Sequence, residues 1–291
     1  SDCAVNAGGG SQPFRLSFLS LFAAMHPHRI QRHPPQSRHM SAEEDACIVA
    51  ASYQGHGSKT VVELWLRARE GHSTLLLVHG LRPFLEIAVI GKTGDLPNDI
   101  EERLEKVRKV KDVTLIHSPV DKWTDLGTKP HWKVEVKQPY NVPKIRDALK
   151  SDGWVVTSAD IVFPQRLLLD LNLGPHIAWK GELLPKDGDT IRDAGGRGLY
   201  PTDQVARCHI DDLRAIEAFA APLVTFSFDL ETSIESGQIL CAAAVVEQNG
   251  ESETHTFRGD EREMLEGLTR LVRDSDPDII TGYNIDNFDL P

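Results

Sequence analysis

The chain has 291 residues, an ordinary globular composition and a formal net charge of −11 at pH 7, and its length suffices for about two domains. No apolar run reaches the 18 residues of a transmembrane helix, and four widely spaced cysteines without a Cys-x-x-Cys pair (Cys3, Cys47, Cys208, Cys241) exclude a zinc knuckle and argue against a disulfide scaffold. Taken as a whole, the negative charge also argues against a protein that binds phosphate backbones through a basic surface.

The acidic residues are concentrated near the end of the chain. Residues 223–291 contain fifteen acidic and four basic side chains, whereas residues 41–150 are nearly neutral. An acidic block is typical of a disordered tail, a solvated face or a metal site. Regular alternation of apolar residues within this block argues against the disordered tail.

The first 45 residues differ from the rest. They contain a glycine run, an apolar stretch over 14–25 that is too short to span a bilayer, and a stretch rich in His, Pro and Arg. No basic segment precedes the apolar stretch, as a signal peptide requires. We therefore expect residues 1–45 to be a disordered or non-native extension, with Met40 as the natural start.

Strand and helix patterns alternate from residue 46 to residue 171 and predict a small α/β domain. Periodicity and punctuation predict a hairpin (Val61–Leu66 with Thr74–Val78), a helix (Asp99–Val110), two strands (Val113–Ile116, Trp132–Val136), a helix from Asn141 with Pro143 in its first turn, a strand at Val155, and a helix (Asp160–Leu171). Residues 172–222 are rich in Gly, Pro and Asp and contain patterns of short strands, and we expect a connector there.

The last segment predicts a mixed sheet with one helix. Val224–Leu230 alternates apolar and polar residues, so it should form a strand with one apolar face. Two further strands follow, and then a helix that begins at Asp260 with Glu263 in capping-box position and ends before Pro277. A last strand should start at Ile279.

Asp229 and Glu231 should project from the same face of the first of these strands, about 7 Å apart. Two carboxylates so placed repel each other unless a cation lies beside them, and Mg²⁺ or Mn²⁺ prefers such oxygen ligands. A pair facing solvent at a strand end is the alternative, and for an isolated Asp-x-Glu it is the commoner one.

The heptad Tyr283–Asp289 follows the last predicted strand. Asp289 offers a third carboxylate from a neighbouring element, Asn284 offers an amide, and Phe288 offers a ring that can stack on a base. By itself this heptad also fits a polar loop with Asn and Asp turns.

Taken together, Phe228–Thr232, the helix, Asp276–Ile280 and Tyr283–Asp289 resemble the first two exonuclease motifs of family B DNA polymerases, in the same order and spacing. The resemblance implies an α/β (α+β) protein that ends in an incomplete ribonuclease H-like 3′–5′ exonuclease domain over 223–291. It further implies two Mg²⁺ ions, or Mn²⁺, held by Asp229, Glu231 and Asp289, with Glu231 also orienting the attacking water. Tyr283, Asn284 and Phe288 are then expected to contact the single-stranded primer end.

The N-terminal part resembles the archaeal branch of the same family, in which a pocket reads template uracil ahead of synthesis. The matching positions are Tyr53, Pro83, Pro139, Val142, Pro143, Ile161, Phe163 and Arg166. A small apolar slot excludes the methyl group of thymine, while backbone groups bind the base edge. These residues also fit ordinary core and turn positions, and Asn141 and Val162 depart from the family pattern.

The sequence is therefore expected to be the N-terminal fragment of a replicative polymerase that binds primer-template DNA. The sliding clamp is expected to bind through a missing C-terminal part, and no membrane is involved. The location would be the cytoplasm (nucleoid) in an archaeon or the nucleus in a eukaryote. The fragment alone is not expected to polymerise DNA, and it is not expected to be fully active as a nuclease because one metal ligand of the family is missing. Two alternatives remain open, namely a nucleic-acid-binding module with an inactive nuclease site and a stand-alone exonuclease of the same acid-metal chemistry.

Overall fold

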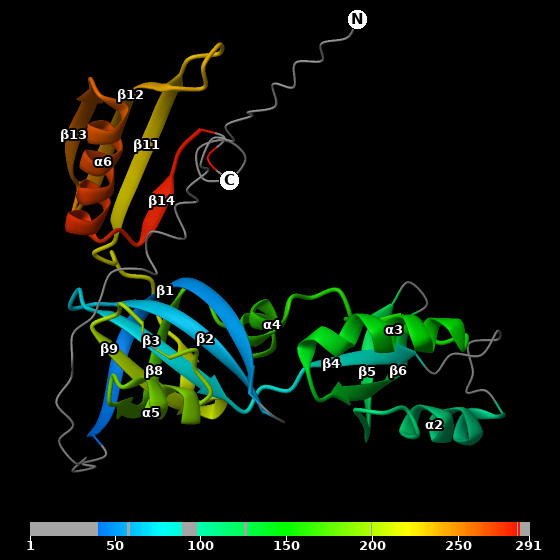
Figure 1. The fold of residues 1–291 in the computed structure, drawn as a ribbon. Helices are drawn as coiled ribbons and strands as arrows, with labels where there is room; N and C mark the ends of the chain where they lie inside the picture. Colours follow the sequence, from blue (N-terminus) through cyan, green and yellow to red (C-terminus); the bar gives the residue numbers. More distant parts are fainter. Residues whose placement is uncertain are drawn as a thin grey trace, which may run out of the picture. The chain divides into compact units, whose positions relative to one another are not determined.

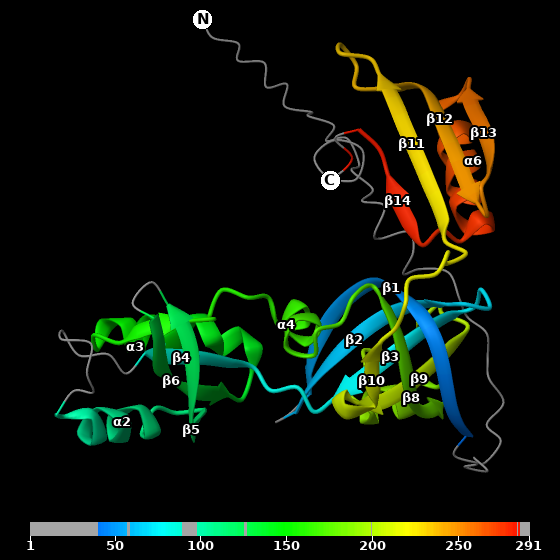
Figure 2. The same ribbon diagram turned by 180° about the vertical axis from the view of Figure 1, so that it is seen from behind.

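The computed structural model describes residues 40–56, 59–88, 98–124, 127–198, 200–283 and 285. The described residues fall into two compact units, one ending at Leu223 and one beginning at Val224 (Figures 1 and 2). Strands and helices are mixed in both units, which confirms the α/β prediction. None of the helices in the described ranges combines the length and the apolar character needed to cross a membrane.

A curved sheet of six strands forms the larger part of the first unit. Its order is β1-β2-β3-β9-β8-β10, and β1 also pairs with β8, so that five of the strands form a closed ring. A register shift between Ile48 and Ala50 interrupts the pairing of β1 with β2, and such bulges let a strand bend. The strands are β1 (Met40–His56), β2 (Lys59–Ala68), β3 (Ser73–His79), β8 (His176–Leu184), β9 (Gln204–His209) and β10 (Leu213–Ala215).

Both faces of this sheet are covered by apolar side chains. One face carries a core that includes Leu64, Leu76 and Trp179, and helix α4 (Phe163–Asp170) adds Phe163 and Leu167 to it. On the other face, Leu77 and Val205 pack with Ile191 of the short helix α5 (Gly188–Asp193). Because both faces are covered, the strand sequences have apolar residues on both faces of the sheet.

The short strands expected in residues 172–222 are present, but they belong to the first sheet rather than to a connector. These residues supply β8, β9 and β10 together with α5 and the 3₁₀ turn η2 (Ile210–Asp212), and three of these are strands of the first sheet. Strand β8 pairs with β1 and strand β9 with β3, both more than 90 residues earlier, so no local pattern reveals these two pairings. The strand β1 likewise begins at Met40, inside the expected extension, while residues 1–39 lie outside the described ranges.

A second, four-stranded sheet is inserted between β3 and β8. Its order is β5-β6-β4-β7, and Leu104, Val107, Ile145 and Leu149 of its two long helices pack into one core with Leu85 and other strand residues. The predicted helices and strands of this region are confirmed. The elements are β4 (Phe84–Ala88), α2 (Ile100–Arg108), β5 (Val113–Thr124), β6 (Gly127–Val136), η1 (Pro139–Asn141), α3 (Val142–Ser151) and β7 (Val155–Thr157).

The second unit is a four-stranded sheet of order β13-β12-β11-β14 with one helix. The strand β14 runs parallel to β11, and the other pairs are antiparallel. Helix α6 packs Leu268 against Phe226, Phe228 and Ala244 on one face of the sheet. The elements, all as predicted, are β11 (Val224–Thr232), β12 (Ile239–Gln248), β13 (Glu251–Arg258), α6 (Glu261–Ser275) and β14 (Ile279–Thr281).

Asp260 caps helix α6. Its carboxylate accepts hydrogen bonds from the backbone N–H groups of Arg262 (3.0 Å) and Glu263 (3.2 Å), which have no partner within the helix. We expect Asp260→Ala to destabilise the helix by about 1 kcal/mol, which amounts to about fivefold faster hydrogen exchange of its amides. Asp274→Ala, which removes an exposed acid at the opposite end of α6, is the matched control and should leave exchange unchanged or slower.

Candidate functional site

Strand β11 presents the two predicted acids on one face. Phe226 and Phe228 point toward α6 and are buried, so the intervening positions point the other way. Asp229 and Glu231 are both exposed on that other face. The structure therefore places this predicted pair as expected, on consecutive positions of one sheet face.

Strand β14 lies beside the part of β11 that directly precedes the acids. It pairs in parallel with β11, with Thr281 opposite Ser227, and the N–H of Asp278 donates to the carbonyl of Val224 at 2.9 Å. Gly282 follows, and a Cβ at that position would lie 2.5 Å from the carbonyl oxygen of Phe228. Only glycine allows so close an approach of the two backbones.

The second predicted set lies mostly outside the described residues. Tyr283 is described and is 90% exposed. Asn284, Phe288 and Asp289 lie outside the described residues, and so does the predicted third carboxylate. Among the described side chains, no group of three or more His, Cys, Asp or Glu is arranged to hold a metal ion. Two exposed carboxylates on one face nevertheless match the oxygen chemistry that Mg²⁺ and Mn²⁺ require.

The predicted pocket residues meet in one cavity of the first unit, of about 440 Å³. It lies where β1 and α4 meet the inserted sheet module. All eight predicted residues line it, namely Tyr53, Pro83, Pro139, Val142, Pro143, Ile161, Phe163 and Arg166. The helix expected over Asp160–Leu171 begins only at Phe163, because residues 159–162 leave helical conformation and line the cavity instead.

Aromatic contacts and a buried cation shape this cavity. The rings of Tyr53 and Phe163 meet edge to face at a centroid distance of 5.6 Å, and the Arg166 guanidinium lies 3.8 Å from the centre of the Phe84 ring. Arg166 is only 4% exposed, and burial lowers the pKa of its guanidinium. It donates to the carbonyl of Ser158 at 2.5 Å and lies 3.7 Å from Asp170, so the buried charge is held by acceptors.

A polar cluster fixes the strand that carries Tyr53. Arg197 donates to the Tyr53 carbonyl at 3.4 Å and lies 3.4 Å from the buried carboxylate of Glu63. Tyr200 donates to the same carboxylate at 2.5 Å, and burial raises the pKa of its phenol. Arg197 and Tyr200 lie in the segment expected to be a connector, so the sequence interpretation missed them.

Sequence reasoning also missed Arg146 and Ala159 as lining residues. Arg146 lies three positions after Pro143 on α3, and this helical spacing is the one signal that could have identified it. Its Nε donates to Asp147 at 2.8 Å, which raises the pKa of Arg146 and lowers that of Asp147. A cation thus lies at the rim of the apolar cavity.

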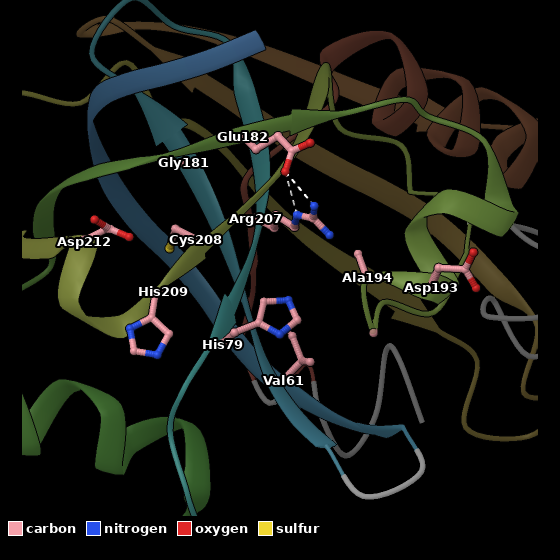
Figure 3. Close-up of a pocket in the computed structure, with 11 residues that line it drawn as sticks. Val61, His79, Gly181, Glu182, Asp193, Ala194, Arg207, Cys208, His209 and Asp212 are labelled. Carbon is pink, nitrogen blue, oxygen red and sulfur yellow. Dashed lines mark hydrogen bonds and ion pairs between the residues drawn. The ribbon is translucent and has the colours of Figure 1, made fainter. Parts of the chain in front are cut away.

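A second cavity, of about 430 Å³, lies beside α5 in the first unit (Figure 3). Arg207 and Glu182 form a close ion pair there at 2.7 Å. Burial raises the pKa of the Cys208 thiol to about 12, so this sulfur stays protonated and is a poor nucleophile. His209 lies 3.0 Å from Asp211. Arg207 is thus paired with Glu182, and His209 with Asp211.

Comparison with known proteins gives consistent matches over most of the chain. Residues 246–291 match the exonuclease domain of DNA polymerase family B. A DNA polymerase of Archaeoglobus fulgidus is 29% identical over 84% of this chain and 29% of its own length. DNA polymerase 2 of Aeropyrum pernix is 23% identical over 84% of this chain, and the DNA polymerase delta catalytic subunit of rice is 23% identical over 81%.

The fold is similar to that of the family B DNA polymerase from the archaeon Pyrobaculum calidifontis. That structure superposes with a TM-score of 0.60 and 23% identity, over 84% of this chain and 31% of the other. The chain therefore spans less than a third of the length of these relatives.

Proposed function

We propose that this chain, which is similar to family B DNA polymerases over most of its length, is the N-terminal part of such an enzyme, with a template-binding domain followed by the first part of a 3′–5′ exonuclease domain. The observation that carries the proposal is the exposed pair Asp229 and Glu231 on one sheet face, just ahead of the segment that matches the family exonuclease domain. Residues 40–223 would be the template-binding domain, and residues 224–291 the exonuclease part.

The exonuclease part would hydrolyse the phosphodiester bond at the 3′ end of a single strand. Asp229, Glu231 and Asp289 would hold divalent metal ions, which when bound lower the pKa of water and stabilise the leaving oxygen. The Glu231 carboxylate would accept a hydrogen bond from the attacking water and thereby orient it. Asn284, Phe288 and Tyr283 would hold the terminal nucleotides, with the ring of Phe288 stacking on a base.

The cavity of the first unit would take a template base turned out of its stack. Pro, Val and Ile side chains form part of its walls, so the shape of this apolar part would decide which base enters and would exclude the methyl group of thymine. The cation–π contact of Arg166 with Phe84 and its hydrogen bond to Ser158 would hold these cavity-lining residues in place. The cavity would thus detect uracil in the template.

The partners that follow from this proposal are primer-template DNA and a single-stranded primer end. Residues 41–150, which are nearly neutral, would contact the template. A sliding clamp would bind residues that lie beyond this chain in the full-length enzyme.

The proposal is tested with the full-length enzyme that carries this chain. With Mg²⁺ and single-stranded DNA labelled at its 5′ end, we expect stepwise shortening from the 3′ end, and with primer-template and deoxynucleotides we expect extension. Chelation of the metal should stop both reactions. Extension without any 3′ shortening would refute the exonuclease assignment, and robust shortening by the 291-residue chain alone would show that residues beyond it are not needed.

A further inference from the structure

The exonuclease part has few basic side chains for a domain that is proposed to bind negatively charged DNA. Residues 223–291 contain fifteen acidic and only four basic side chains. Arg262, Arg270 and Arg273 all lie on α6, which packs on the sheet face opposite to the acids. Arg258 is the one basic residue of this segment that lies on a strand.

The sheet register places Arg258 in the same row as Glu231. Glu231 lies opposite Cys241 across β11 and β12, and Cys241 lies opposite Arg258 across β12 and β13. Residues in one row share a face, and the neighbouring row of Leu230, Ala242 and Phe257 faces α6. Two strand spacings separate the Cα atoms of Glu231 and Arg258 by about 10 Å.

The side chain of Arg258 is exposed, and it forms no ion pair or hydrogen bond with any described residue of the second unit. By contrast, Arg262 on α6 binds Glu266 at 2.9 Å. Between Arg258 and Glu231 the row holds only the short side chain of Cys241, so nothing bulky separates the guanidinium from the acid pair. A guanidinium presents a planar fork of donors that matches a phosphate group.

We propose that Arg258 binds a backbone phosphate of the single strand, next to the phosphate that is cleaved at Asp229 and Glu231. The inference rests on the proposed exonuclease function and adds a substrate-binding residue to it. Arg258 offsets the repulsion between the acidic face and the DNA beside Asp229 and Glu231. It takes no part in the bond-breaking step, so it should affect substrate binding rather than turnover.

The test compares Arg258→Gln, Arg258→Lys and the control Arg270→Gln in the full-length enzyme. Mg²⁺-dependent shortening of a short single strand is measured at several salt concentrations. For Arg258→Gln we expect KM to rise about fivefold with kcat unchanged, and the slope of log KM against log salt to fall by about 0.7, as one lost phosphate contact requires. Arg258→Lys should retain the slope, and Arg270→Gln should match the wild type.

Unchanged KM and salt slope in a normally folded Arg258→Gln enzyme would overturn the inference, and so would an equal loss in Arg270→Gln. If the wild type shortens DNA and Asp229→Ala does not, such a result leaves the proposed function intact and refutes the role of Arg258 alone. A wild-type enzyme without any 3′ shortening would refute both.

Discussion

Asp229→Ala in the full-length enzyme should reduce 3′–5′ degradation by about 100-fold or more while leaving primer extension intact. Groups that merely orient a metal ligand already contribute about 10- to 100-fold to metal affinity or activity, so removing a ligand should cost at least as much. The side chain is exposed on the sheet face away from α6, so its loss leaves the packing of Phe226 and Phe228 unchanged. Rates of degradation and extension on the same primer-template measure the effect.

Glu251→Gln is the matched control for this variant. Glu251 is an exposed acid at the start of β13, at the end of the sheet far from Glu231, and its replacement also removes one negative charge. Equal activity of the Asp229→Ala and Glu251→Gln enzymes would mean that β11 does not carry the nuclease site. A loss of extension together with degradation would instead indicate misfolding, which a thermal unfolding curve detects.

Val142→Gln should abolish the preference of the enzyme for template uracil over thymine. Val142 is the first residue of α3 and lines the cavity, so a longer polar side chain would occupy the space proposed for the base. Excluding one methyl group from an apolar pocket corresponds to about 1–3 kcal/mol, or about 10- to 200-fold in affinity. The measurement is the Kd for primer-template with either base ahead of the primer end.

Val155→Gln is the control, because it makes the same Val-to-Gln change outside the cavity. Val155 lies on β7 of the same sheet module and is 60% exposed, and it does not line the cavity. This variant should retain the wild-type preference. A wild-type enzyme with equal affinity for both templates, or a Val142→Gln enzyme that still discriminates, would show that the cavity does not read uracil.

Local patterns predicted the elements whose determinants are local. The alternation of Phe226 and Phe228 with polar residues identified β11, and the Asp260 cap and the apolar stripe with Leu268 identified α6. Each signal depends on residues a few positions apart, and the structure forms each element where the pattern indicated. The same holds for α3, where Pro143 in the first turn marks the start of the helix.

The first sheet could not be predicted in this way. Strand β9 pairs with β3, with Leu75 opposite Val205, across 130 residues of sequence. The turns rich in Gly and Asp around β8 and β9 look like a linker when they are read without those partners. The polar cluster of Glu63, Arg197 and Tyr200 was missed for the same reason, because its members meet only after the ring of strands has closed.

The insertion of one sheet module within another has a consequence for synthesis on the ribosome. The module from β4 to β7 has its own core, including Leu85 and Leu149, and its last strand is complete at Thr157. Strand β3 ends at His79, but its neighbour β9 begins only at Gln204. The ribosome adds about 5–20 residues per second, so the edge of β3 that pairs with β9 stays unpaired for about 6–25 s. The inserted module can fold during that interval. The order of synthesis therefore favours folding of this module before the ring of strands closes.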